Sequence, residues 1–175
     1  IEFGKFYGFD VTKIDAQEVD DVAVSSTKIR KALHEGDVRA ANSFLGYNFM
    51  LTGIVTKGKG LGKDLNFPTA NIHIEEPYKL IPKDGVYLVQ SNLNGMQKYG
   101  MMNIGKNPTV SQDHQTHIEV HFFDFDEQLY GEKLQIDLID RLRDEIKFPN
   151  IEALKAQLKQ DKTIAQQRIN LLSKI

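Results

Sequence analysis

Thr69 and Asn71 offer two oxygen ligands at a spacing that could serve one metal ion. Pro68 stiffens the backbone before them, and in an extended segment residues two apart point to the same side. A hydroxyl oxygen and an amide oxygen are hard ligands that Mg²⁺ accepts beside water and phosphate oxygens. A Thr-x-Asn pair is more often a hydrogen-bonding feature of a strand edge, so the metal interpretation depends on its surroundings.

A glycine-rich loop precedes this pair, with Gly58, Gly60 and Gly62 alternating before Lys63. Positions without side chains let backbone N–H groups close on an anion, which predicts phosphate binding. A flexible hairpin tip is the alternative, because three glycines spaced by two are not specific. The spacing matches neither the Walker phosphate-binding pattern nor the dinucleotide-binding pattern.

Glu119 lies in a segment, residues 117–122, whose apolar and polar residues alternate as in a half-buried strand. Its polar face carries His117, Glu119 and His121. In a cleft, Glu119 could accept a proton from a substrate hydroxyl during phosphoryl transfer. A solvated sheet face is the alternative, and a three-ligand metal site is disfavoured because alternate residues on a strand stand about 7 Å apart.

Two short helices are predicted ahead of these residues. Hydroxyl residues can cap a helix from about Ser26 to Glu35, and Gly36 can end it. Asp37 can cap a second helix that ends at Gly46. The domain boundary is therefore placed at 46/47, and with no Pro or Ser linker there we expect a packed junction.

From Phe49 onward the periodicity becomes that of strands, which predicts a β domain. Asn92 to Gly95 supply the residues of a tight hairpin turn. Asn150 can cap a helix after the strands, and Asp161 can cap a second one. The predicted strands are 50–56, 85–91, 97–104, 116–124 and 133–140.

Length and composition narrow the function further. A chain of 175 residues has room for one full domain and a small module. With 22 basic and 24 acidic residues, it lacks the basic excess of a nucleic-acid-binding protein, and without cysteine it has no thiolate chemistry. No apolar run approaches the roughly 20 residues that span a bilayer, so we expect a soluble, cytoplasmic protein without a membrane partner.

Taken in order, the motifs between about residues 47 and 160 resemble the riboflavin kinase family. They are the glycine loop with Gly53 and Val55, FPTANI over 67–72, GVY over 85–87, NIG over 103–105 with Pro108 and Thr109, EVH over 119–121, LYG over 129–131 and LRDEIKF over 142–148. The front part, with VSSTKIR over 24–30 and Gly36 to Asn42, resembles the end of the FMN adenylyltransferase domain that precedes the kinase in bacterial bifunctional proteins.

The resemblance implies a mainly β fold: a six-stranded antiparallel Greek-key barrel with C-terminal helices at 47–175. A short helical remnant of an α/β nucleotidyltransferase domain would precede it at 1–46. The implied reaction moves the γ-phosphate of ATP to the 5′-hydroxyl of riboflavin, with Mg²⁺, giving FMN and ADP.

The resemblance also implies roles for single residues. Glu119 would be the catalytic base, and Thr69 and Asn71 would hold Mg²⁺ and phosphate. The implied ATP-binding residues are Gly58, Gly60, Gly62, Lys63, Thr69, Asn71 and Tyr130, and the implied flavin-binding residues are Arg143, Ile146 and Phe148. Leu61 and Asn66 differ from the family's usual arginine and glycine, so we expect the loop conformation and phosphate affinity to differ.

Three other functions stay open at this stage. The chain could be a flavin- or nucleotide-binding module without turnover, or an OB-like oligonucleotide module, which the acidic balance disfavours. A longer parent protein could also adenylate FMN to FAD. These 175 residues hold no H-x-G-H-type motif near their beginning, so we expect no FAD synthesis from them. The sequence does not predict an oligomeric state.

Overall fold

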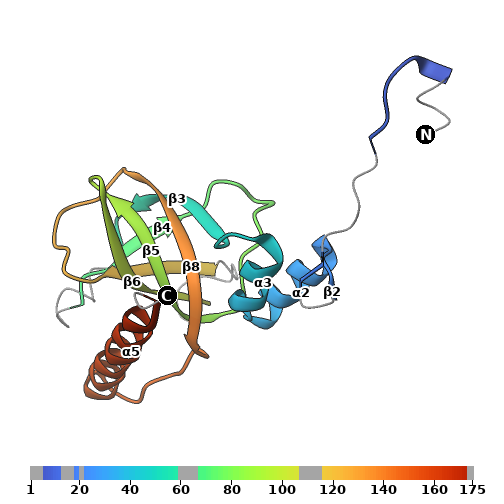
Figure 1. The fold of residues 1–175 in the computed structure, drawn as a ribbon. Coiled ribbons are helices and arrows are strands. Elements are labelled where there is room, and N and C mark those ends of the chain that lie inside the picture. Colours follow the sequence, from blue (N-terminus) through green and yellow to red (C-terminus); the bar gives the residue numbers. More distant parts are fainter. Residues whose placement is uncertain (1–5, 13–17, 20–21, 59–66, 107–115, 173–175) are drawn as a thin grey trace.

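Six antiparallel strands close into a barrel with the order β3-β4-β7-β6-β5-β8 (Figure 1). The structure is a computed structural model that describes residues 6–12, 18–19, 22–58, 67–106 and 116–172. The barrel strands are β3 (Met50–Thr56), β4 (Ala70–His73), β5 (Gly85–Leu93), β6 (Met96–Lys106), β7 (Thr116–Phe122) and β8 (Lys133–Arg143). The predicted six-stranded antiparallel barrel is thus confirmed.

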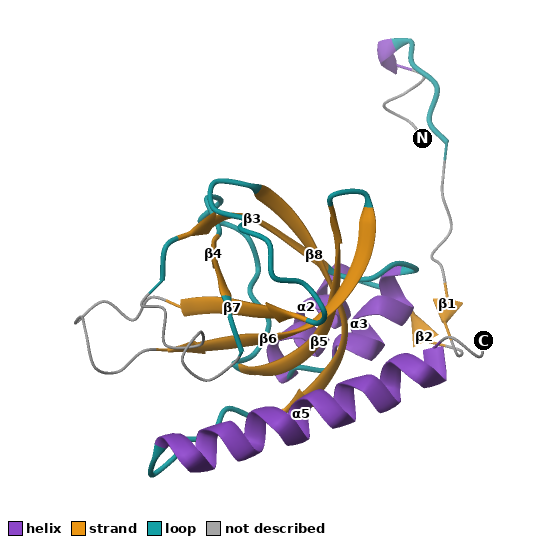
Figure 2. Ribbon diagram, turned by 90° about the vertical axis from the view of Figure 1, so that its left-hand side faces the viewer, coloured by secondary structure: helices purple, strands orange, loops and turns teal. Residues whose placement is uncertain are grey.

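Alternation along the strands divides the apolar residues between two packed layers. On β5, Tyr87 and Val89 belong to the core cluster inside the barrel, and Val86 and Leu88 belong to a second cluster outside it. The second cluster also contains Ala165 of the C-terminal helix α5 (Ile151–Leu172), which lies across the outside of the barrel (Figure 2). This explains why β5 is buried on both faces.

The strand predictions hold with shifts at the ends. β3 has the predicted bounds, whereas β5, β6 and β8 run two or three residues further. β7 ends at Phe122, before the turn in which Asp124 has a φ of 51°. The predicted hairpin turn is confirmed, because Asn94 and Gly95 connect β5 to β6 with φ values of 51° and 80°. β4 is an additional strand, since only an extended stretch was expected there.

Both N-terminal helices form as predicted. Ser25 accepts a hydrogen bond from the Lys28 amide at the start of α2 (Ser26–Glu35), and Asp37 accepts one from the Ala40 amide at the start of α3 (Val38–Leu45). Both helices end at a glycine in the left-handed conformation. The two-residue strands β1 (Glu18–Val19) and β2 (Val22–Ala23) pair ahead of them and were not predicted.

The C-terminal segment is one helix, so the prediction of two is wrong. Asn150 does cap it, accepting a hydrogen bond from the Ala153 amide at 2.9 Å. Asp161 is not a cap, because it lies within the helix, is 1% exposed and accepts hydrogen bonds from Arg143 and Gln157.

The junction between α3 and the barrel is packed, as expected. The Asn42 side chain donates to the Leu138 carbonyl on β8 at 2.8 Å and accepts from the Phe49 amide at 2.7 Å. Leu33 and Val38 belong to the same apolar cluster as the barrel interior. The two helices are therefore physically part of the barrel's core, while the domain boundary at 46/47 stays a prediction.

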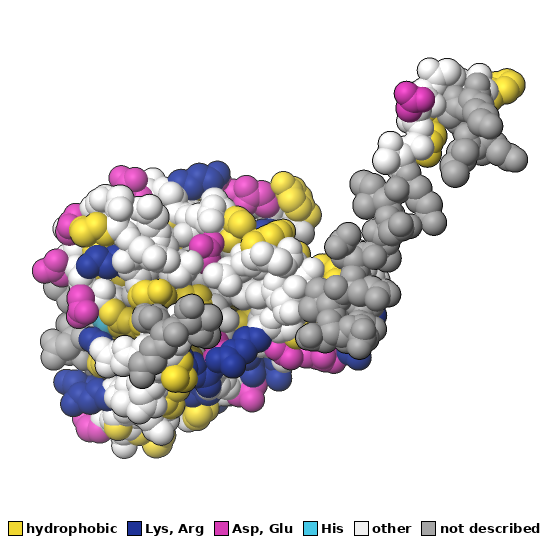
Figure 3. Space-filling view, viewed as in Figure 1, with side chains coloured by type: hydrophobic (Ala, Val, Ile, Leu, Met, Phe, Trp, Pro, Cys, Tyr) yellow, Lys and Arg dark blue, Asp and Glu magenta, His cyan; other side chains and the backbone are white. Residues whose placement is uncertain are grey.

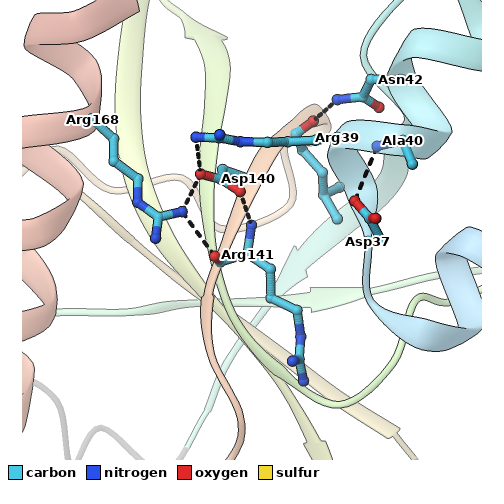
Figure 4. A network of polar contacts seen from close by, with 8 residues as sticks. Asp37, Arg39, Ala40, Asn42, Asp140, Arg141 and Arg168 are labelled. Atoms are coloured by element: carbon cyan, nitrogen blue, oxygen red, sulfur yellow. Dashed lines mark hydrogen bonds and ion pairs between the residues drawn. The ribbon is translucent and has the colours of Figure 1, made fainter. Parts of the chain in front are cut away.

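Asp140 on β8 joins elements from both ends of the chain (Figure 4). Its carboxylate accepts hydrogen bonds from Arg39 on α3, at 2.5 Å, and from Arg168 on α5. Arg168 also donates to the Arg141 carbonyl at 2.9 Å. Because Asp140 is 6% exposed, this carboxylate depends on these partners and not on water.

The surface in Figure 3 carries lysine and arginine side chains interspersed with acidic ones. Among the helices of the described residues, none has the length and apolar character needed to cross a membrane.

Replacing Asp140 by asparagine should lower the free energy of unfolding by about 1.5–3 kcal/mol, the typical value of hydrogen bonds to a charged group. The physical reason is that two guanidinium groups would lose their shared anion. Urea unfolding of D140N against the wild type measures the change, with D126N at an exposed position as the control. Equal losses in the two variants would contradict the role given to Asp140.

Candidate active site

Thr69 and Glu119 meet where β4 pairs with β7. Asn71 is opposite Glu119 in this ladder, and Ala70 is opposite Val120. Residues directly opposite on antiparallel strands share a face, and so do residues two apart on one strand. Thr69, Asn71 and Glu119 therefore lie on one side of the sheet. The Thr69 hydroxyl donates a hydrogen bond to Glu119 Oε2 at 3.1 Å.

Two cavities adjoin this pair, and Thr69 lines both of them. The first, here called the Tyr130 cavity, has a volume of about 330 Å³ and is also lined by Val55, Phe125 and Tyr130. The second, here called the Phe148 cavity, has a volume of about 310 Å³. Its walls include Glu119, Arg143, Ile146 and Phe148. The structure thus brings together in one cavity the predicted base Glu119 and the three residues that the family resemblance assigned to flavin binding.

Gly58 and Asn71 are in direct contact. A Cβ atom added to Gly58 would lie 1.9 Å from Asn71 Nδ2, so only glycine leaves room for this amide. The contact brings the start of the predicted phosphate loop to the predicted metal ligand. Gly60, Gly62 and Lys63 lie outside the described residues, as do Leu61 and Asn66.

Arg143 is held mainly by the protein itself. Its Nε and Nη2 atoms donate to the Asp161 carboxylate at 2.8–3.0 Å, and its Nη1 donates to the Asp144 carbonyl at 2.9 Å. Its guanidinium carbon lies 5.8 Å from the centre of the Phe148 ring, a cation–π distance. The arginine therefore fixes the Phe148 segment to α5, and three of its five N–H donors are already engaged within the protein.

Asp161 is the cavity residue that the sequence analysis assigned wrongly. Leu158, Ala165 and Ile169 form a helical stripe on the buried side of α5, and Asp161 interrupts it. A single acidic residue within an apolar stripe predicts a buried ion pair, because a buried charge needs a partner. That pattern could have identified Asp161, although not Arg143 as its partner.

Asn103 and Glu145 also line the Phe148 cavity, and the motifs contained them without a role. The Glu145 carboxylate lies against the β6 backbone, since a Cβ on Gly105 would be 2.2 Å from its Oε1. The Phe148 cavity is therefore lined by both apolar and polar side chains.

His121 follows Glu119 on the same face and is buried. Its Nδ1 lies 2.9 Å from the Pro68 carbonyl oxygen, which can only accept, so Nδ1 carries the proton. Burial lowers the pKa of His121 below its ordinary value of 6.5, with Lys162 acting in the same direction. The Pro68 hydrogen bond and Asp124 oppose the shift but do not reverse it.

The alternative of a metal site on β7 gains no support. Within the described ranges, no three His, Cys, Asp or Glu side chains form a group that could hold a metal ion. The donor set of Thr69 and Asn71 fits a hard cation that takes its other ligands from water and phosphate.

The chain is thus a closed β-barrel with two cavities that share Thr69. The chain belongs to the riboflavin kinase family, whose family model (Flavokinase, riboflavin kinase) matches residues 45–169.

Curated relatives agree with this assignment. The chain is 43% identical over 153 residues to the bifunctional riboflavin kinase/FMN adenylyltransferase of Listeria monocytogenes, covering 87% of the chain and 48% of the relative. It is 36% identical over 169 residues to the protein of the same description from Escherichia coli K12, covering 96% and 53%. The chain therefore spans about half the length of these relatives.

A solved structure supports the fold. The chain is similar to a Streptococcus pneumoniae protein described as a macrolide-efflux protein, with a TM-score of 0.83 and 31% identity. The match covers 94% of this chain and 54% of that one.

Replacing Gly58 by alanine should displace the Asn71 amide with little loss of stability, because a side chain can rotate away. Replacing Gly100 by alanine is the contrasting control, since its Cβ would lie 2.6 Å from the His121 carbonyl oxygen, which is backbone. We expect a shifted Asn71 side-chain amide resonance in G58A, and a loss of about 1–3 kcal/mol in G100A. An unchanged Asn71 resonance in G58A would contradict the contact.

Stability should fall as the pH drops below about 6.5, in part because of His121. The unfolded chain binds the histidine proton near pH 6.5, whereas the folded state binds it only at lower pH. The unfolded state then holds more protons in this window, so lowering the pH favours unfolding. Urea unfolding between pH 7.5 and 5.5 measures the effect. H121N, which cannot titrate, should lose less stability over this range. The charged groups near residue 121, Glu119, Asp124 and Lys162, are the same in both proteins, so the difference between them reports on the histidine.

Proposed function

We propose that this chain transfers the γ-phosphate of ATP to the 5′-hydroxyl of riboflavin, giving FMN and ADP. The observation that carries the proposal is the hydrogen-bonded pair of Thr69 and Glu119 at the point where two cavities meet. Family membership supports the choice of substrates.

The arrangement of the cavities suits phosphoryl transfer. The attacking and leaving oxygens must lie roughly in line on opposite sides of the phosphorus. A nucleotide on the Tyr130 side and an alcohol on the Phe148 side would approach Thr69 from two directions. Glu119 lines the Phe148 cavity, where its carboxylate would accept the proton of the attacking hydroxyl.

The Phe148 cavity has features that a flavin would use. Apolar side chains such as Met101, Leu158 and Phe148 can cover a flat ring system, and Asn103 and Glu145 offer hydrogen bonds at its edge. Ile146 is 47% exposed and could close over a bound ring. Arg143 would contribute by orienting Phe148, because its charge is already paired with Asp161.

The nucleotide side is proposed around Tyr130, Gly58 and the metal ligands. The Thr69 hydroxyl donates a hydrogen bond to Glu119, so its oxygen would face a cation with its lone pairs. Asn71 would supply the second ligand, and a bound Mg²⁺ would neutralise phosphate charge. Gly60, Gly62 and Lys63 complete the proposed ATP site on the strength of the family resemblance.

We also propose that residues 1–46 are the end of an adenylyltransferase domain and that residues 47–175 are the kinase domain of a longer cytoplasmic, bifunctional protein. Support comes from the relatives' descriptions and from the half-length coverage. A binding module without turnover is the competing function, and it would leave Glu119 without a role.

Replacing Glu119 by glutamine should lower FMN formation by about a hundredfold or more, the usual effect of losing a general base. The purified chain is incubated with riboflavin, ATP and Mg²⁺, and the flavins are separated by chromatography. E132Q, exposed just before β8, is the matched control and should keep wild-type activity.

Riboflavin binding, followed by flavin fluorescence, separates the two functions. A folded wild-type chain that binds riboflavin without forming FMN would favour the binding module. Equal activity of E119Q and the wild type would reject Glu119 as the base while leaving the kinase assignment intact.

A further inference from the structure

His121 lies beside the proposed catalytic pair without belonging to it. Its ring packs edge-on against Phe67 and Phe123, with centroids 5.0 and 5.8 Å away. The residue is 9% exposed, so its nitrogen atoms have few competing water contacts. Its Nδ1–H donates to the Pro68 carbonyl oxygen at 2.9 Å.

This hydrogen bond acts where the regular strand pairing stops. The β4–β7 ladder comprises the pairs Asn71–Glu119 and Ala70–Val120, and Thr69 lies one residue beyond it. Continuing the register by one step would place Thr69 opposite His121. The His121 side chain therefore ties the chain to β7 just beyond the end of the ladder.

The tied carbonyl belongs to the same peptide unit as the Thr69 amide. A peptide unit is planar, so holding the Pro68 oxygen also restricts the orientation of the Thr69 backbone. Pro68 has its own φ fixed by its ring. Together these constraints limit where the Thr69 hydroxyl can lie relative to Glu119, 3.1 Å away.

We propose that His121 is a positioning residue: by donating from Nδ1 to the Pro68 carbonyl, it sets the Thr69 hydroxyl against Glu119. The inference rests on the proposed function, because it gives Thr69 the part of a metal and phosphate ligand. It goes beyond that function because it assigns the alignment of Thr69, the proposed metal ligand, with Glu119, the proposed base, to the side chain of His121.

A purely structural role for the ring is the alternative, since the ring also fills space between two phenylalanines. Two substitutions separate the roles. Asparagine can place an N–H group near the position of Nδ1, whereas leucine fills a similar volume without a donor. Both remove the aromatic ring and both change the wall of the Phe148 cavity.

H121L should lower kcat by tenfold to a hundredfold, the scale expected when a reacting group is misplaced. It should also need more Mg²⁺ for half-maximal activity, because Thr69 would no longer be held in place. H121N should recover most of kcat and the wild-type Mg²⁺ requirement. Its KM for riboflavin should stay changed, as in H121L, since both variants remove the imidazole from the wall of the Phe148 cavity.

The possible outcomes test the positioning role of His121 separately from the proposed kinase activity. An inactive wild-type chain would overturn the proposed kinase function. An active wild type with equal kcat and Mg²⁺ requirement in H121L and H121N would overturn the positioning role alone. Urea unfolding of both variants shows whether each is folded.

A measurement on the wild type tests the geometry independently of any variant. Long-range ¹H–¹⁵N spectra of histidine-labelled protein distinguish the two imidazole tautomers. We expect His121 with a protonated Nδ1 and an unprotonated Nε2 at pH 7.5. The opposite tautomer would overturn the proposal, because Nδ1 could then not donate to Pro68.

Discussion

The short strand β4 is the constraint on which the candidate site depends. It has four residues, yet it pairs with β3 on one side and with β7 on the other, and without it the barrel would not close. Closure brings Thr69 and Asn71 next to Glu119, which is about fifty positions away along the chain. A ladder of two residue pairs between β4 and β7 offers little rigidity by itself. Side-chain contacts at its ends, such as the hydrogen bond from His121 to Pro68, are therefore important for holding β4 in place.

β8 plays the corresponding role for the helices. Its inward residues complete the core, while Asp140 and Arg143 form ion pairs with residues outside the barrel. Arg143 and Asp161 connect the wall of the Phe148 cavity to α5. A buried pair of this kind adds little net stability compared with apolar packing, but it specifies one arrangement, since either partner alone would be an uncompensated charge.

Local signals in the sequence predicted most of the elements, because caps, glycine stops and alternation act over a few residues. Ser25, Asp37 and Gly36 act as expected, and β3 has the predicted bounds. The failures concern tertiary interactions. Asp161 has the residue type of a helix cap but lies inside α5, and the sequence alone does not reveal its partner Arg143 on β8.

In the candidate site, too, the sequence predicted some features and only the structure revealed others. The family motifs named Thr69, Glu119 and Phe148, whereas the bond from His121 to Pro68 and the pairing of Arg143 could be found only in three dimensions. The roles of these residues in catalysis remain proposals. What the structure adds is their grouping around two cavities that meet at Thr69.

The packed junction at Asn42 shows that the region matching the family differs from the region that shares one hydrophobic core. The sequence pattern predicts a boundary at 46/47 and the family match begins at residue 45, but Leu33, Val38 and Ala41 are buried in the same core as the barrel strands. The unit that folds is therefore larger than the unit that carries the family motifs. A truncation made at 46/47 would remove these three side chains from the core and expose the barrel residues that they cover, so α2 and α3 belong to any folded unit that contains the barrel.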